Sequence, residues 1–305
     1  MLSYAVKRLV TGFAVIIFVS FGIFVLTNIA VDPAVALAGD GASAADIEAT
    51  RKSYGFDRPV LERYANWLGQ IAGGDLGDSY RERRPVLDLM GERLPVTLWL
   101  GLASLAVALL IAIPTAVISA LRPGSTIDRA ALFVAMLGQG MPTFWLALLL
   151  MQFFSLYLGW LPISGSGTAS SFVLPALALG SASAPVIMRL TRAGMIEVLG
   201  SDYIRMARAK GLRSGTILWK HALRNAIVPA VSVAAVQFGF MLGGSIVVET
   251  IFAMQGIGYL AWTSISLGDL PVIQAIILLT SFFYVTLMIL ADLLNAWLDP
   301  TLRAR

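Results

Sequence analysis

The hydrophobic pattern of this chain consists of long runs without a charged residue, separated by short charged segments. A helix needs about 20 mostly apolar residues to cross a bilayer. Five runs are long enough, and they cover residues 9–31, 94–121, 130–188, 225–248 and 270–291. The third is too long for one crossing, and its segment 159–171 is rich in Gly, Pro and Ser, which is typical of a loop. The pattern therefore predicts six membrane spans.

Another uncharged stretch, residues 250–268, differs from these runs because it contains several Gly, Ser and Thr residues. Tyr259 and Trp262 within it are of the aromatic type that gathers at membrane–water interfaces. We expect a short interfacial or partly re-entrant helix here rather than a further span.

The first run follows Lys7 and Arg8, an arrangement that secretory signal peptides share. The run 9–31 is longer than the apolar core of a typical signal peptide, however, and no clear small-x-small cleavage site closes it. We therefore interpret it as a retained membrane span.

The composition agrees with a membrane protein. Hydrophobic residues make up 58% of the chain and charged residues 13%, whereas a soluble domain has about 25% charged residues. The mean hydropathy is +0.81. The absence of cysteine excludes disulfides, thiolate metal sites and cysteine nucleophiles. A single histidine, His221, excludes a metal site built from several histidines.

Lysine and arginine collect on one side of the expected spans. Short loops follow the positive-inside rule, whereas long loops are exempt from it. The short loops 159–171 and 249–270 contain no basic residue. Most of the 22 basic residues fall in the segments that the rule assigns to the cytoplasm, namely Lys7, Arg8, Arg122, Arg129, the stretch 189–224, Arg303 and Arg305. Both termini are therefore expected in the cytoplasm.

The long segment 32–93 is expected on the external side. It contains three prolines, several aromatic residues and a helix-like run at 44–53. We expect a small folded cap that is too short and too poor in apolar residues to be an independent domain. The chain then divides into an N-terminal region with the first span (1–31), the cap segment (32–93) and a core with the other spans (94–305).

Candidate residues for catalysis or ion coupling are scarce. None of the four lysines ends a phosphate-binding loop of the kind an ATPase needs. His221 lies in a charged loop, away from the depth at which an intramembrane serine protease would need it. No expected span has a carboxylate near its middle, where a proton- or ion-coupled carrier would place one. Glu249 and Asp292 lie near span ends, where we expect a solvated interface, so the chain is expected to form a pathway without its own energy source.

The charged loop 191–224 is the strongest functional candidate. Ser201 can cap the first turn of a short helix, Asp202 suits the positive end of its dipole, and Lys210 suits the negative end. Gly211 is a natural stop residue after the last turn. The loop is also far longer than a connection between two spans requires.

This short helix is expected to be amphipathic. It places Tyr203, Ile204 and Ala207 on one side, and Arg205 and Arg208 on another. A second helix is expected to begin near Ser214. A short amphipathic helix held between two spans fits a groove on a partner protein. The alternative is that the charges of the loop only fix the orientation of the chain in the membrane.

The stretch SDYIRMARAKGLRSGTILWKHALRNAIVPAVS, residues 201–232, resembles the cytoplasmic signature loop of ABC-importer permeases of the dipeptide, oligopeptide and nickel branch. In such permeases this EAA-type motif presents a coupling helix to an ATP-binding subunit. Its leading positions would be Arg205, Met206 and Ala207, followed by Gly211, with Arg and Met where Glu and Ala are usual. The chain is similar to B-type permeases in YGFDRPVLERYANWL, GGDLGDSY, ERLPVTLWL, PALALG, LGGSIVVETIF, GIGYL and DLLNAWLDPTLR.

The resemblance implies a type I ABC-importer permease fold, which is an all-α polytopic membrane protein with six transmembrane helices. It implies a place in a bacterial or archaeal cytoplasmic (inner) membrane, surrounded by the lipid bilayer and without a nucleic acid partner. The expected partners are a homologous C-type permease, two ATP-binding subunits and a periplasmic or lipid-anchored solute-binding protein. ATP and Mg²⁺ would bind to the ATP-binding subunits, so this chain is expected to be no enzyme and to carry no cofactor.

The resemblance also assigns the ATPase coupling to the short helix and its stop residue, which comprise Ser201, Asp202, Tyr203, Ile204, Arg205, Met206, Ala207, Arg208, Lys210 and Gly211. Di- or oligopeptides are the implied cargo. Nickel or a nickel chelate, glutathione and oligosaccharides are alternatives within the same architecture. A channel or secondary carrier that works without ATPase partners is the alternative of a different class.

Three further features have more than one interpretation. Gly243 and Gly244 either let a neighbouring span approach closely or contribute to the pathway. Pro114 and Pro142 can kink their spans. The charged segment 81–84 either contacts the binding protein or the partner permease, or is simply solvated.

Overall fold

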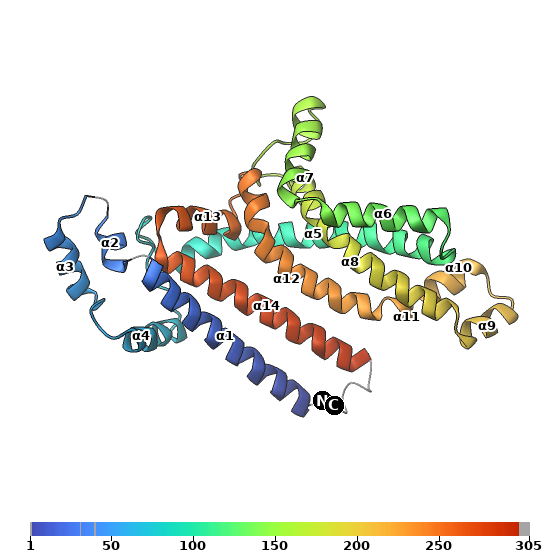
Figure 1. Cartoon of the computed structure of the whole chain (residues 1–305), viewed down its shortest axis with the longest axis horizontal. Coiled ribbons are helices and arrows are strands. Elements are labelled where there is room, and N and C mark those ends of the chain that lie inside the picture. The colour runs from blue at the N-terminus through green and yellow to red at the C-terminus, as the bar shows by residue number, and fades with distance from the viewer. Residues whose placement is uncertain (1, 31, 40, 299–305) are drawn as a thin grey trace.

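The structure is a computed structural model that describes residues 2–30, 32–39 and 41–298. Within these residues the regular elements are helices, apart from a single bridge between Asp78 and Pro85. Figure 1 shows an elongated molecule in which the long helices run along the long axis. The predicted all-α class is confirmed for the described part of the chain.

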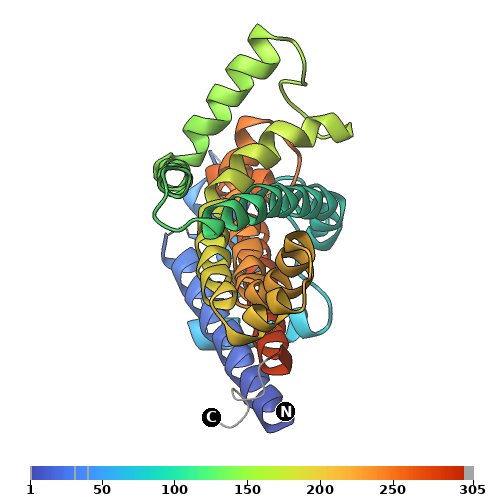
Figure 2. The ribbon, with the colours of Figure 1, turned by 90° about the vertical axis from the view of Figure 1, so that its right-hand side faces the viewer.

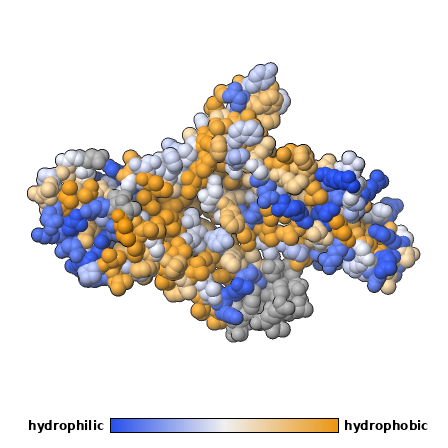
Figure 3. Space-filling model, in the orientation of Figure 1, coloured by the Kyte–Doolittle hydropathy of each residue, from blue (hydrophilic) through white to orange (hydrophobic). Residues whose placement is uncertain are grey.

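Five helices in the described residues are long and apolar enough to cross a membrane. They are α1 (Leu2–Ala30), α5 (Val86–Leu121), α8 (Val173–Leu199), α12 (Val228–Ile251) and α14 (Leu270–Leu298). Figure 3 shows hydrophobic residues over the middle of this face and hydrophilic residues towards both ends. This distribution is the one that a bilayer around the middle of the molecule requires.

The third predicted span is not a continuous helix. It consists of α6 (Thr126–Gly140) and of α7 (Thr143–Leu150), which a π-helical segment (Met151–Tyr157) extends. The two parts meet at an angle of 99°, and α7 projects from the body of the molecule (Figure 1). Pro142 explains the break, because a residue before proline avoids the helical conformation, and Met141 is extended with ψ 127°. Counted as one span, this bent pair brings the five long helices to the predicted six.

Two helices extend into segments that were expected to be the cap and the charged loop. Helix α5 begins at Val86, within the expected cap segment, and α8 continues to Leu199, within the expected loop 191–224. Thr191 and Met195 are fully buried in the last turns of α8. Packing therefore keeps these turns helical although charged residues interrupt the apolar run. The part of that loop outside α8 starts at Gly200.

The segment predicted to be an external cap contains three short helices, namely α2 (Pro33–Ala38), α3 (Ala44–Ser53) and α4 (Val60–Ala72). Helix α3 has the predicted bounds, with Ser43 and Asp46 forming a capping box at its start. Helix α4 is anchored on α1. The Tyr64 hydroxyl lies 2.7 Å from that of Ser20, and its ring packs against Phe24.

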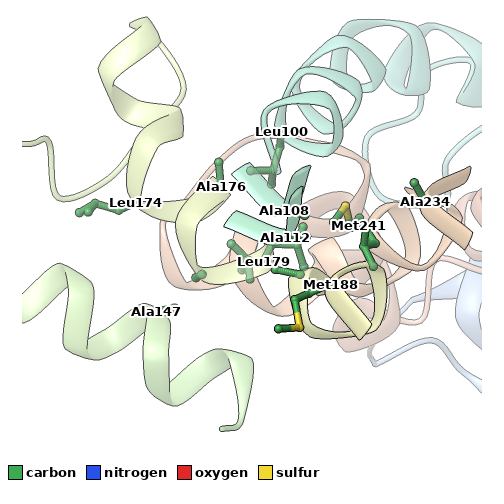
Figure 4. Packing of buried hydrophobic residues seen from close by; sticks show 14 of the residues in the cluster. Leu100, Ala108, Ala112, Ala147, Leu174, Ala176, Leu179, Met188, Ala234 and Met241 are labelled. Carbon is green, nitrogen blue, oxygen red and sulfur yellow. The ribbon is translucent and has the colours of Figure 1, made fainter. Parts of the chain in front are cut away.

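The largest hydrophobic core lies between α5 and α8, and α12 completes it (Figure 4). Most of its buried residues are small or flexible, among them Ala108, Ala112, Ala176 and Met188. Gly180 allows the close contact, because a Cβ atom at this position would lie 2.5 Å from the carbonyl oxygen of Ser104. Small residues bring membrane helices together in this way.

Helices α1 and α14 pack antiparallel beside this core. Arg8 and Asp292 form an ion pair of 3.2 Å at one end, and Gln274 donates a hydrogen bond of 2.7 Å to Thr27 near the other end. The starting end of α1 and the final end of α14 therefore lie at the same end of the molecule, as the expected orientation requires. Arg303 and Arg305, which also entered that expectation, lie outside the described residues.

Candidate functional site

The candidate coupling helix is α9 (Asp202–Ala209), which follows α8 after a two-residue turn. It lies at the end of the molecule opposite the cap (Figure 1), and Figure 2 views the molecule from that end. The chain then forms α10 (Ser214–Thr216), a π-helical segment (Ile217–Ala222) and α11 (Leu223–Ala226) before it enters α12. The second helix thus begins at Ser214, as predicted.

The start of α9 differs from the prediction in one respect. Ser201 occupies the N-cap position with extended backbone angles, but its side chain caps no backbone N–H of the helix. Its hydroxyl instead donates a hydrogen bond of 2.6 Å to the carbonyl of Val198, in the last turn of α8. The tight turn brings that carbonyl within reach, so Ser201 secures the end of α8 rather than the start of α9. Asp202 lies in the first turn, where it pairs with Arg205.

The end of α9 has the predicted form. Lys210 is the C-cap residue, and Gly211 follows it in the left-handed region with φ 75°. The Gly211 N–H donates to the carbonyl of Arg208 at 2.9 Å, and the Leu212 N–H donates to that of Ala207 at 3.3 Å. A residue without Cβ suits this conformation, and the resulting bonds satisfy carbonyls of the last turn.

One face of α9 is buried. Ile204 is completely inaccessible and Ala207 nearly so, and together they pack into a cluster that we call the coupling cluster. Its other buried members are Val117, Ala120, Met195, Ile217, Ala222 and Ala226, which come from α5, α8 and the segment after α9. Tyr203 accepts a hydrogen bond of 2.8 Å from the Asn225 side chain. The helix is therefore fixed to three parts of the chain.

The other face of α9 is exposed. Met206 is 60% exposed, and the side chain of Arg205 is 71% exposed. Arg208 and Lys210 are also exposed. Met206 adds accessible apolar surface to this basic face, and Leu212 and Trp219 in the segment after α9 are also exposed.

A buried ion pair supports this region from α6 and α8. Arg192 donates two hydrogen bonds of 2.7 Å, one to each carboxylate oxygen of Asp128. Asp128 is 2% exposed, and it also accepts a bond from Ser119 and one of 2.7 Å from the Gly124 N–H. The pair was not predicted from the sequence. Its one local sign is an acidic residue, Asp128, three positions after Ser125, the residue that caps α6.

A second buried carboxylate, that of Glu249, lies at the C-terminal end of α12. Glu249 is fully buried, so the expected solvated interface is wrong for this residue. It accepts a hydrogen bond of 2.7 Å from Thr97 of α5 and one of 2.9 Å from the Tyr259 N–H of α13 (Ile257–Leu267). Thr97 accepts a bond from the Ile257 N–H. The carboxylate thus joins α5 and α12 to the first turn of α13, a helix that the sequence predicted.

Gly243 and Gly244 lie on an exposed face of α12. A Cβ atom at Gly243 would meet no atom within 4 Å, and one at Gly244 would meet only Leu179 at 3.9 Å. Close packing against another helix of this chain therefore does not explain these two glycines in the described structure.

The charged segment 81–84 is not fully solvated. The Arg81 side chain donates hydrogen bonds to the Leu267 carbonyl, so Arg81 is bound to α13.

The described residues contain no group of three or more His, Cys, Asp or Glu side chains that could hold a metal ion. The geometry around α9 is that of a helix held rigidly on its inner face and open on its outer face. If a partner protein binds the exposed face of α9 and moves it, this arrangement can transmit the displacement to α5 and α8.

Two family models match the chain. The model described as binding-protein-dependent transport system inner membrane component matches residues 112–304, and the N-terminal model of such membrane components matches residues 1–101. Among curated proteins, the glutathione transport system permease protein GsiC of Pectobacterium atrosepticum is 41% identical over 304 residues. That of Escherichia coli (strain K12) is 40% identical over the same length. Each alignment covers 99% of both chains.

Among solved structures, two crystal forms of the methionine ABC transporter MetNI in inward-facing conformations are similar. Both have a TM-score of 0.53, with 21% and 22% sequence identity. The first alignment covers 71% of this chain and 95% of the MetNI chain, and the second 72% and 96%. At this identity the likeness establishes the fold alone.

Proposed function

Because this chain belongs to the family of inner membrane components of binding-protein-dependent transport systems, we propose that it forms half of the import pathway for glutathione or a closely related small peptide. The observation that carries the proposal is its identity of about two fifths, over nearly the whole chain, with glutathione transport permeases.

Family membership also establishes the coarser function. The chain is a multi-pass inner-membrane permease subunit of a binding-protein-dependent ABC importer. Subunits of this kind have no ATPase activity and carry no cofactor, and the importer includes ATP-binding subunits and a solute-binding protein. The predicted fold class and location are confirmed.

The proposed substrate was an alternative in the sequence-based prediction. That prediction placed di- or oligopeptides first and named glutathione among the alternatives, and the curated relatives favour glutathione. Glutathione is itself a tripeptide, so the chemical class of the cargo is nearly the same. Nickel chelates and oligosaccharides receive no comparable support from these relatives.

For energy coupling, α9 is the proposed contact with an ATP-binding subunit. Its exposed face offers the apolar Met206 beside the basic Arg205, Arg208 and Lys210. Its inner face transfers any displacement directly to the coupling cluster, because Ile204 is completely buried there. ATP-driven closure of two ATP-binding subunits would then rock the spans between two states, as differential binding permits.

A homologous C-type permease is the proposed second half of the pathway. The exposed Gly243 and Gly244 on α12 support this, because they leave a smooth helix surface with almost no neighbour in this chain. A partner span can approach such a surface closely, or a solute can pass along it.

Reconstitution of the importer tests the proposal. The complex of both permeases and the ATP-binding subunits is placed in proteoliposomes with ATP on the side of α9, and labelled glutathione and the solute-binding protein on the other side. We expect accumulation that stops when the ATP-binding subunits cannot hydrolyse ATP. Import of a dipeptide but not of glutathione would refute the proposed substrate. Uptake by this chain alone, without ATP, would instead favour a secondary carrier.

A further inference from the structure

A cavity of about 1000 Å³ opens between the cap helices, α1 and the start of α14. Its size is at the upper end of that of ordinary small-molecule pockets. The residues that line it include aromatic side chains, such as Tyr54, Trp67 and Tyr80, and polar ones, such as Asn28 and Gln70. It lies on the external side, far from α9, and none of the features described above accounts for it.

Arg63 of α4 is one of the charged residues that line this cavity; the others are Lys52, Arg58, Arg83, Asp75 and Asp78. Its guanidinium donates hydrogen bonds to two neutral acceptors, the Asn28 side chain and the Phe56 carbonyl. It also lies 5.2 Å from the ring centre of Phe56 and 5.9 Å from that of Phe24. Burial lowers the pKa of Arg63, but a guanidinium stays charged in a protein. Two of its five N–H donors are occupied by these contacts.

Within the described residues this charge forms no ion pair of its own, although Asp32 is close enough to raise the pKa of Arg63. Asp32 is paired with Arg51 at 2.6 Å, and Asp75 accepts a bond from the Gly77 N–H. Arg63 is half-buried, and charges withdrawn from water are normally paired. A half-buried cation among aromatic rings and amides in a cavity can therefore bind an anion from outside.

We propose that this cavity binds the carboxylate of a small peptide on the external side of the importer, with Arg63 as its counter-ion. The proposal rests on the proposed function, since it concerns the same cargo. An arginine binds a carboxylate strongly because its planar donors match the two oxygens. Trp67 and Tyr54 offer apolar surface for the rest of the peptide. Burial, together with the nearby Asp269 carboxylate, raises the pKa of Tyr80 to about 12, so its phenol remains a hydrogen-bond donor at neutral pH.

Calorimetric titration of the complete permease–ATPase complex in nanodiscs, without the solute-binding protein, tests this inference. The probes are glutathione and its diamide, in which both carboxylates are amidated, and a second pair, triglycine and triglycine amide. We expect saturable binding of each acid and binding of each amide that is weaker by about ten-fold or more. This comparison uses the wild-type protein and does not depend on the folding of a variant.

Variants then locate the site. Arg63→Met is expected to reduce the affinity for the acid to that for the amide, and Arg63→Lys to cause a smaller loss. The matched control is Arg84→Met, because Arg84 belongs to the same external segment but is paired with Glu92 and does not line the cavity. It is expected to leave the affinity unchanged.

Equal binding of acids and amides by the wild-type complex, or an unchanged affinity in Arg63→Met, would overturn the inference even if the importer takes up glutathione. An importer that carries a different peptide would overturn the proposed substrate instead. The triglycine pair would still report whether the cavity recognises a carboxylate.

Discussion

The stop residue of the coupling helix offers a sharp test of the coupling mechanism. Gly211 has φ 75°, and a Cβ atom at this position would meet nothing within 4 Å. Replacement therefore acts through the backbone and not through a clash. A non-glycine residue in this region costs roughly 1–2 kcal/mol, and a β-branched residue is the least suited. Gly211→Val is thus expected to destabilise the end of α9 by about 2 kcal/mol.

The chain supplies a matched control. Gly215 in α10 is also exposed and has open space around its Cβ position, but it is not among the residues with positive φ. Gly215→Val adds the same side chain close by without backbone strain, so it is expected to be nearly neutral. Gly211→Asn should be milder than Gly211→Val, because asparagine tolerates the left-handed region.

Two measurements on the reconstituted importer read out the effect. A destabilisation of about 2 kcal/mol raises the population of the open form of a local equilibrium roughly 30-fold, and hydrogen exchange of residues 203–212 reports this opening. The number of ATP molecules hydrolysed per imported glutathione should rise, because a frayed helix transmits less of the displacement. Wild-type exchange and coupling in Gly211→Val would refute the reasoning. Equal losses in Gly215→Val would attribute the effect to side-chain bulk at the contact with the ATP-binding subunit.

Three other predictions concern charged groups. Arg205→Glu reverses an exposed charge on α9 and is expected to lower the yield of ATP-binding subunits that co-purify with the permease; an unchanged yield would place Arg205 outside the contact. Asp128→Asn leaves the partly buried Arg192 without its counter-ion, so we expect the free energy of unfolding to fall by about 3–5 kcal/mol in thermal unfolding. The double variant, which also carries Arg192→Gln, should lose less. If the single and the double variant unfold alike, the ion pair does not carry this stability. Glu249→Gln can no longer accept both hydrogen bonds, so exchange of the amides in residues 255–263 should quicken by an amount that corresponds to about 1–3 kcal/mol; unchanged exchange would show that the carboxylate does not hold α13.

Local signals in the sequence predicted the bounds of α3 and the end of α9. The helix-like run 44–53 is α3 itself, and Gly211 ends α9 through its own backbone conformation. The sequence could not reveal that Ser201 donates to Val198, because that bond depends on the angle between α8 and α9.

Long-range contacts explain what the sequence missed. Glu249 lies at the end of an apolar run, and only the approach of α5 and α13 buries it. Arg192 appeared as one of many loop charges, whereas the structure places it within α8 against Asp128. The cap cavity likewise combines residues from positions 24 to 274. No local pattern marks such sites, since their members meet only after the chain has folded.

Helix α8 reaches from the coupling cluster to the opposite end of the membrane-spanning region. Its 27 residues correspond to a rod of about 40 Å. A tilt of about 10° at the end next to α9 would therefore shift the other end by roughly 7 Å. The loop before that other end is bound to the C-cap residue of α12, because the Gly165 N–H donates to the Phe252 carbonyl at 2.8 Å. A small rotation next to α9 would thus produce a larger displacement at the opposite end of α8, close to Phe252, which lies three residues after Glu249.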